Sequence, residues 1–158
     1  MDSILNNIRI RQATKQDDAP LWEFMTEHNY YEGGDRIKPM ARDYLDAAFS
    51  DEYRKPTFLV GMDGDTIVAC GAYTEEYFTV DVWGISWVTV APEYRRKGIG
   101  TKITAALCDH IREAAGKDVT ILLNTYPGKT KLYERCGFEG GGQDHCGGTF
   151  MVKHVKAA

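Results

Sequence analysis

The stretch SWVTVAPEYRRKGIG, residues 86–100, joins a long apolar run to a segment with helical periodicity. The run 82–90 is the longest apolar one in the chain and predicts a central strand, which Pro92 would end because proline cannot donate to a sheet ladder. Beyond it, apolar residues recur at helical spacing at Ile99, Ile103, Leu107 and Ile111. Gly116 is placed to end that helix in a left-handed conformation. The stretch therefore predicts a strand, a tight turn and a helix in direct succession.

The turn in this unit combines glycine with positive charge. Gly98 and Gly100 would let the backbone approach a ligand closely, and the first N–H groups of the following helix have no partner within it. The helix dipole makes that end partly positive, and Arg95, Arg96 and Lys97 add charge, so we expect a phosphate group to bind here. The alternative is a glycine pair that only eases a tight turn beside a solvated run of charge. Neither the GxGxxG fingerprint nor the phosphate-binding P-loop is present.

The N-terminal half is expected to hold a strand, two helices and a hairpin. Residues 8–11 alternate apolar with polar side chains, as an opening strand does. Thr14 can cap a first helix, and Pro39 can open a second. Apolar, β-branched runs on either side of Asp63-Gly64 predict two antiparallel strands joined by a tight turn.

The C-terminal part completes the expected fold. Residues 119–123 and 149–155 are expected as strands, with a short helix around Tyr133 between them and a glycine-rich turn over residues 140–148. The predicted fold class is α/β: a mixed central sheet of six or seven strands flanked by about four helices. With 158 residues, the chain is expected to be one domain spanning residues 1–158.

Composition and charge exclude several classes of protein. The four cysteines form no CxxC pair and no ligand set for a metal, so we expect reduced thiols and no metal site. No apolar run reaches the roughly 20 residues that a membrane span needs, and no secretory signal begins the chain, which favours a cytoplasmic location without membrane attachment. A net charge of −4 favours no binding to nucleic acid and slightly favours a cationic partner.

Two separated motifs resemble the GNAT superfamily of acyl-CoA-dependent N-acyltransferases. Arg95, Gly98 and Gly100 fit that family's pyrophosphate signature, Q/R-x-x-G-x-G/A, directly after the strand 82–90. The segment 131–138, KLYERCGF, looks like the family's Y-x-x-x-G-F ending. The resemblance implies a three-layer fold whose central strand carries a bulge and splays from its neighbour. It also implies acetyl-CoA as co-substrate and direct transfer of the acetyl group to an amine through a tetrahedral intermediate.

The same resemblance implies roles for individual residues. The N–H of Val88 would stabilise the oxyanion, and Tyr133 would protonate the leaving thiolate. The cofactor-binding residues would be Val88, Val90, Arg95, Arg96, Lys97, Gly98, Ile99, Gly100, Thr101 and Asn124. The alternative is that Val88 and Val90 are ordinary core residues of a strand and that Tyr133 only packs its ring.

The sequence gives less information about the residues that would bind and deprotonate the acceptor. Gly84 stands where the histone acetyltransferases of the family carry a glutamate, so that base is not transferred. Candidate bases are Glu32, Asp35, Glu75, Glu76 and Asp81, among which Glu32 and Asp81 are favoured slightly. The expected acceptor pocket is built from Tyr30, Tyr31, Glu32, the connection 73–81 with Asp81 at its end, and Trp83. Aromatic rings beside carboxylates suit an organic cation. His145 and Cys146, in the glycine-rich turn, could contact substrate or a partner subunit.

Three functions follow from these residues. The expected one is acetyl transfer to a primary amine of a small molecule. The alternatives are an enzyme that acetylates a protein or peptide, and a regulatory domain that binds acyl-CoA without chemistry. A homodimer formed through the final strands is compatible with each of them.

Overall fold

A mixed seven-stranded sheet forms the centre of the protein in the computed structural model, which describes residues 3–28, 34–79 and 81–158. The strand order is β1-β2-β3-β4-β5-β7-β6, and only the β4–β5 pair is parallel. The strands are β1 (Arg9–Gln12), β2 (Thr57–Asp63), β3 (Thr66–Glu75), β4 (Val82–Val90), β5 (Val119–Thr125), β6 (Glu139–Gln143) and β7 (Thr149–Val155). This architecture confirms the α/β class and the predicted hairpin, whose turn holds Gly64 at φ 59°.

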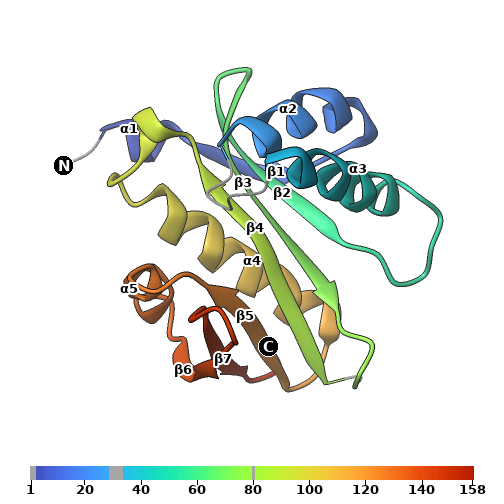
Figure 1. Cartoon of the computed structure of the whole chain (residues 1–158), viewed down its shortest axis with the longest axis vertical. Helices are drawn as coiled ribbons and strands as arrows, with labels where there is room; N and C mark the ends of the chain where they lie inside the picture. Colours follow the sequence, from blue (N-terminus) through green and yellow to red (C-terminus); the bar gives the residue numbers. More distant parts are fainter. Residues whose placement is uncertain (1–2, 29–33, 80) are drawn as a thin grey trace.

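Helices cover both faces of the sheet, with α2 and α3 side by side on one face and α4 on the other (Figure 1). The helices are α1 (Ser3–Asn7), α2 (Asp18–His28), α3 (Ile37–Ala48), α4 (Ile99–Ala115) and α5 (Thr130–Glu134), with 3-10 turns η1 (Lys15–Asp17), η2 (Gly34–Arg36) and η3 (Pro92–Tyr94). None of these helices, within the described ranges, is long and apolar enough to cross a membrane.

The alternation of side chains along the strands divides the core in two. Leu59, Tyr73 and Ile85 pack under α4, whereas Phe58 and Val60 pack under α2 and α3. Successive residues of a strand point to opposite faces, so one strand serves both layers. The same alternation puts Gly84 and Ser86 of β4 on the face that α2 and α3 cover. We call it the α2–α3 face.

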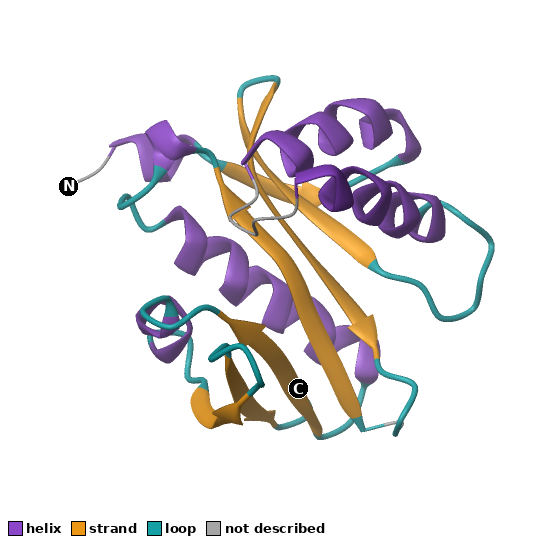
Figure 2. Ribbon diagram, in the orientation of Figure 1, coloured by secondary structure: helices purple, strands orange, loops and turns teal. Residues whose placement is uncertain are grey.

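The parallel strands β4 and β5 separate after a short contact. Their register covers only Val82 to Gly84 on β4, against Thr120 to Leu122 on β5. Strand β5 instead pairs with β7 over its whole length. Figure 2 shows β4 and β5 diverging toward the end of β4 that leads to α4. The splayed central strands that the resemblance implies are therefore present.

Three elements differ from the sequence-based expectations. Helix α1 was not predicted; the Lys102 ammonium donates to the carbonyls of Leu5 and Ile8, at 3.2 and 2.7 Å, and ties this helix to α4. Helix α3 begins at Ile37, so Pro39 lies inside its first turn, where its missing N–H has no helical partner to lose. The first part of the glycine-rich turn is strand β6, because its backbone pairs with β7 whatever its side chains.

An ion pair joins β1 to the 3-10 turn η1, which leads directly into α2. The Arg11 guanidinium donates to both carboxylate oxygens of Asp17, at 2.7 and 2.9 Å, and the Thr14 N–H donates to the same carboxylate at 2.7 Å. The hydrogen bonds from Arg11 and Thr14 lower the pKa of Asp17 to about 2, against the opposing effect of burial. The charged form of Asp17 therefore stabilises the fold.

Asp17→Asn is expected to lower the free energy of unfolding by about 1 kcal/mol at neutral pH, a modest value because the Arg11 side chain is 45% exposed. Because the folded-state pKa is depressed, this stabilisation is complete above about pH 4 and is lost as the pH falls toward 2. Urea titrations over that range should show a smaller acid-induced loss in the variant. The exposed turn residue Asp65, changed to Asn, is the control, and equal pH dependence in both variants would contradict the assignment.

Candidate active site

A cleft of about 970 Å³ opens where β4 and β5 separate. The residues that line it come from four parts of the chain: α3, β4, the turn from η3 into α4, and the segment from the end of β5 through α5. Because Ile85 to Val90 contribute from both faces of β4, the cleft passes through the sheet from the α4 side to the α2–α3 face. Most of the expected site residues line it, namely Val88, Val90, Arg95, Arg96, Gly98, Ile99, Gly100, Thr101, Asn124 and Tyr133.

The turn before α4 forms a concave backbone surface at one end of the cleft. Gly98 is the N-cap of α4 at φ 85°, and Arg96 also has a positive φ, 61°. Such a sequence of conformations turns successive N–H groups toward one point, beside the N-terminal end of a 17-residue helix. The Arg95 side chain donates to the Val90 carbonyl at 2.9 Å and fixes the turn to the end of β4. Lys97 does not line the cleft.

Positive charge dominates the lining. The described lining residues include no carboxylate and six cationic side chains: Arg36, Arg95, Arg96, Lys129, Lys131 and Arg135. Only two of these cations were expected from the sequence; the other four come from α3 and from the segment around α5. A ligand with several phosphate groups suits this distribution, because each phosphate meets cations and backbone N–H groups together.

A bulge in β4 presents one backbone N–H to the cleft. The β3–β4 register passes from Ala72↔Ser86 to Cys70↔Thr89, so β4 carries an extra residue there, and Trp87 has φ 59°. The Trp87 carbonyl accepts from the Cys70 thiol, on β3, at 3.3 Å and from the Thr89 hydroxyl at 3.0 Å. In a trans peptide, C=O and N–H point in opposite directions. The N–H of Val88 therefore points away from β3, toward the separation between β4 and β5.

The Cys70 thiol is well suited to hold this peptide in place. It is fully buried, and burial raises its pKa to about 12, so the thiol stays protonated and can act as a donor at neutral pH. The hydrogen bond from the Cys70 thiol to the Trp87 carbonyl therefore helps to orient the peptide that carries the Val88 N–H. Cys70 itself does not line the cleft.

Tyr133 enters the cleft from the short helix α5. Its side chain is 8% exposed, and its ring packs edge-on against Phe138 at 6.1 Å between centroids. Gly137, at φ 91°, closes the turn after α5 and brings Phe138 back against the ring. The ring of Tyr133 is thus packed against Phe138, and Tyr133 also lines the cleft. A role in core packing and a role in chemistry are therefore compatible for this residue.

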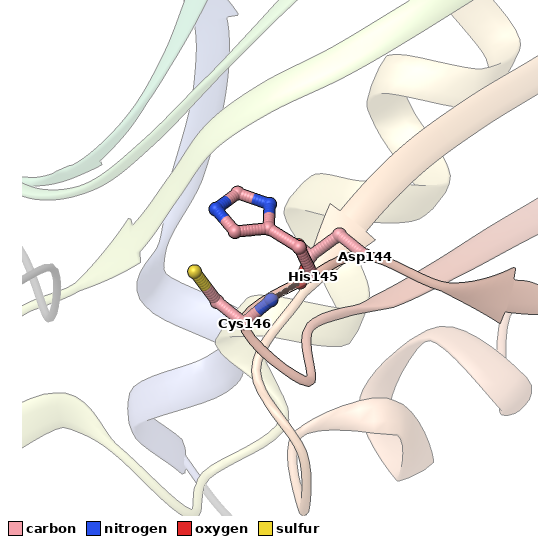
Figure 3. A group of neighbouring side chains, drawn as sticks. All are labelled: Asp144, His145 and Cys146. Carbon is pink, nitrogen blue, oxygen red and sulfur yellow. Dashed lines mark hydrogen bonds between the residues drawn. The ribbon is translucent and has the colours of Figure 1, made fainter.

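Asn124 connects the cleft with the β6–β7 turn. Its amide donates to Asp144 Oδ2 at 2.9 Å, and Asp144 Oδ1 accepts from the backbone N–H groups of Cys146 and Gly148, both at 2.8 Å. These bonds lower the pKa of Asp144. Figure 3 shows the side chains of Asp144, His145 and Cys146 on this turn, where their potential ligand atoms lie within 4.8 Å of one another. The Asp144 carboxylate is already used to close the turn.

Of the acceptor-side residues expected from the sequence, the two that the structure describes, Asp81 and Trp83, do not line the cleft. Tyr30, Tyr31 and Glu32 lie outside the described residues. The Asp81 carboxylate, 65% exposed, accepts from Lys117 at 2.9 Å and does not line the cleft. Trp83 packs against Tyr73 in the core beneath α4, at 6.0 Å between ring centroids.

Another carboxylate occupies the position above Gly84. A Cβ added to Gly84 would collide with Glu76 Oε1, so the Glu76 side chain lies directly over this glycine, on the α2–α3 face of β4. Burial raises the pKa of Glu76, and the charge of Arg54 opposes that rise. Of the other candidate bases, Glu75 forms an ion pair with Arg54 at 3.4 Å and Asp35 is exposed and does not line the cleft.

Comparison with known proteins agrees with this geometry. The sequence profile of the acetyltransferase (GNAT) family matches residues 19–138. The yncA protein of Salmonella typhimurium, solved with its cofactor acetyl-CoA, has a similar fold, with a TM-score of 0.76, 20% identity and 96% of each chain covered. The ribosomal-protein-S18-alanine N-acetyltransferase of Escherichia coli has a similar fold, with a TM-score of 0.70, 16% identity and 96% of each chain covered. The structure of AAC(6')-Ib in complex with ribostamycin and coenzyme A is similar too, with a TM-score of 0.70, 21% identity and 93% of each chain covered.

No curated protein sequence matches the chain significantly, so the family assignment rests on the profile, with the solved structures supporting the fold. The profile covers both sequence motifs and the strand and helix between them. The chain therefore belongs to the acetyltransferase (GNAT) family, whose enzymes are N-acetyltransferases that use acetyl-CoA as the acetyl donor.

Proposed function

We propose that the protein transfers an acetyl group from acetyl-CoA to a primary amine of a small molecule. The observation that supports this proposal is that one cleft is lined by the glycine-containing turn before α4, by Val88 at the bulge and by Tyr133. These are an anchor for phosphates, a donor for an oxyanion and a candidate acid, which is the set that acyl transfer from a thioester requires.

The donor would lie along the cleft in a defined direction. Its pyrophosphate would bind the N–H groups of Arg96 to Thr101, and its thioester arm would run between the separated strands along Val88 and Val90. The carbonyl oxygen of the acetyl group would accept a hydrogen bond from the Val88 N–H. That bond strengthens as charge develops on the oxygen, so it stabilises the transition state more than the ground state.

The reaction would proceed by direct attack. The lone pair of the neutral amine forms a bond to the carbonyl carbon, and the resulting tetrahedral oxyanion is held by the Val88 N–H. Collapse of this intermediate re-forms the carbonyl and breaks the carbon–sulfur bond. The thiolate takes a proton from the Tyr133 hydroxyl, and the nitrogen loses its extra proton to a base. No covalent acyl-enzyme is needed, and burial raises the pKa of both Cys108 and Cys136, which keeps these thiols protonated.

Among the carboxylates that the structure describes, Glu76 is the one we favour for removing the amine's proton. It lies over Gly84, two residues before Ser86 on the same face of β4, and Ser86 lines the cleft. That separation along the strand is about 7 Å, so proton transfer would pass through water. Its raised pKa brings it closer to the working pH of a general base.

Glu76→Gln is expected to lower kcat/KM for the amine by about 100-fold near neutral pH, because general bases contribute roughly 100-fold or more. The loss should shrink at alkaline pH, where the amine is already neutral. Gly84→Ala should reduce activity as well, since its Cβ displaces the Glu76 carboxylate. Glu75→Gln, next in sequence and paired with Arg54, is the control. Full activity of Glu76→Gln across pH would exclude Glu76 as the base.

The fold does not separate small acceptors from protein acceptors. An enzyme solved with the aminoglycoside ribostamycin and one named for ribosomal protein S18 both resemble this chain with a TM-score of 0.70. We keep the small-molecule acceptor that is expected from the sequence, and a screen of amines decides between the two classes.

The proposal is tested by following release of the free CoA thiol from acetyl-CoA in the presence of amines. The screen should include amino acids, polyamines, aminoglycosides, aryl amines and short peptides, and acetyl-CoA binding should be measured by calorimetry on the same samples. Release that depends on a small amine supports the proposal, and release with peptides alone favours the protein-directed enzyme. Tight acetyl-CoA binding without release from any amine favours the regulatory acyl-CoA-binding domain.

A further inference from the structure

One face of α3 forms a wall of the cleft. Met40 and Tyr44 line it together with Arg36, the N-cap residue of α3; the three are spaced four residues apart, so they follow one another along the helix direction. The Tyr44 ring packs edge-on against Trp87 of the bulge, at 5.5 Å between centroids. Met40 is 48% exposed, although it is a large apolar residue. The wall thus consists of an apolar surface with a guanidinium at one end.

The guanidinium of Arg36 stands apart from the other cations of the cleft. Arg95 and Arg96 flank the anion-binding turn, and the remaining three belong to the α5 segment. Arg36 alone comes from the opposite side of β4, where α3 covers the α2–α3 face. Among the described residues, no carboxylate forms an ion pair with it, and none lines the cleft.

This charge distribution decides which acceptors fit. A polycationic acceptor would place additional positive charge beside Arg36 with no carboxylate of the described lining to balance it. A carboxylate on the acceptor would instead receive paired hydrogen bonds from a guanidinium, the geometry that arginine provides and lysine does not. Met40, Tyr44 and Trp87 offer an apolar surface to the rest of the molecule.

We propose that the acceptor is an amino carboxylate with an apolar body, and that Arg36 binds its carboxylate while Met40, Tyr44 and Trp87 contact the body. The inference rests on the proposed function, since it names the acceptor of that reaction. It differs from the organic cation expected from the sequence, since of the carboxylates behind that expectation Asp81 does not line the cleft and Glu32 lies outside the described residues.

The test compares amino acids with the amines that lack only the carboxylate. Phenylalanine is paired with phenethylamine and leucine with isopentylamine, and release of CoA is measured at one near-neutral pH, with kcat/KM expressed per concentration of the neutral amine. The wild-type enzyme should prefer the amino acid of each pair. Arg36→Gln should lower kcat/KM for the amino acids by about 10- to 100-fold, the effect of removing a hydrogen bond to a charged group, and change the plain amines less than twofold.

Three controls make the result specific to the carboxylate. Lys38→Gln removes the same charge two residues away, in the first turn of α3, but Lys38 does not line the cleft, so the kinetics of this variant should stay those of wild type. Arg36→Lys should restore only part of the preference, because an ammonium cannot form the paired hydrogen bonds. The Kd for acetyl-CoA should be equal in all variants.

Several outcomes would overturn the inference. A wild-type preference for the plain amines or for polyamines would do so, and so would an Arg36→Gln defect in acetyl-CoA binding, which would place Arg36 in the donor site. If no amine releases CoA, the proposed function fails by itself. Calorimetry with the CoA-loaded protein still decides the inference in that case: N-acetylphenylalanine should bind more tightly than N-acetylphenethylamine, and Arg36→Gln should abolish the difference.

Discussion

Gly98→Glu is expected to raise the Kd for acetyl-CoA by about 100-fold or more, equivalent to about 3 kcal/mol. Gly98 is the N-cap of α4 with φ 85° and ψ 4°, a conformation that places its backbone beside the expected pyrophosphate. A glutamate there adds a side chain and a negative charge to a concave surface whose N–H groups are aimed at an anion. Calorimetric titration of the variant with acetyl-CoA, and with CoA, measures the effect directly.

The backbone strain of this substitution has to be separated from its effect on the ligand. Gly116, the residue that caps the other end of α4, also has a positive φ, 64°, and an added Cβ there meets nothing within 4 Å. Gly116→Glu therefore introduces the same charge and similar strain about 25 Å away along the helix. Equal losses of acetyl-CoA affinity in both variants would mean that strain, not the anion site, explains the result.

The turn before α4, which lines one end of the cleft, was predictable because contiguous residues build it. A strand, a glycine-containing turn and the first turn of a helix follow one another in 86–100, so local sequence rules determine where their N–H groups lie. The cations of the α5 segment, Lys129, Lys131 and Arg135, were not assigned to the site. They reach it only because α5 folds back across the end of α4.

The acceptor side of the cleft could not be predicted in the same way. Arg36 and Trp87 line the same cleft although they are far apart in the sequence. The periodicity of the sequence does not indicate that α3 packs over the bulge. Glu76 lies over Gly84 because the two strands pair in a particular register, which the sequence does not specify. Asp81 and Trp83 are near in sequence to these residues, yet Trp83 faces the opposite layer of the core and Asp81 bonds Lys117.

The bulge in β4 was expected only from the resemblance to the family. Tryptophan at φ 59° is not favoured by its own conformational preference, so the surroundings must impose it. The two donors to the Trp87 carbonyl, Cys70 and Thr89, provide part of that constraint. A residue that looks like ordinary strand in the sequence is thus held in a strained conformation directly before Val88, whose N–H is the proposed oxyanion donor.

Tyr133→Phe is expected to lower kcat by about 100-fold with little change in the Kd for acetyl-CoA, because the ring and its packing on Phe138 are retained and only the proton donor is lost. The departing thiolate must then take its proton from water. Steady-state kinetics over a wide pH range should also show a change at alkaline pH, where the wild-type rate falls as the phenol loses its proton and the variant has no such limb.

Tyr73→Phe is the matched control for this prediction. Tyr73 and Tyr133 are both 8% exposed, both belong to the core beneath α4, and only Tyr133 lines the cleft. Removal of either hydroxyl therefore has a comparable effect on packing, and thermal unfolding should show similar small changes in stability. A turnover number that stays at the wild-type value in Tyr133→Phe across the pH range, with the fold intact, would mean that the thiolate leaves without help from this residue. A loss of equal size in Tyr73→Phe would assign the effect to packing of the core, because a phenol outside the cleft has no access to the sulfur.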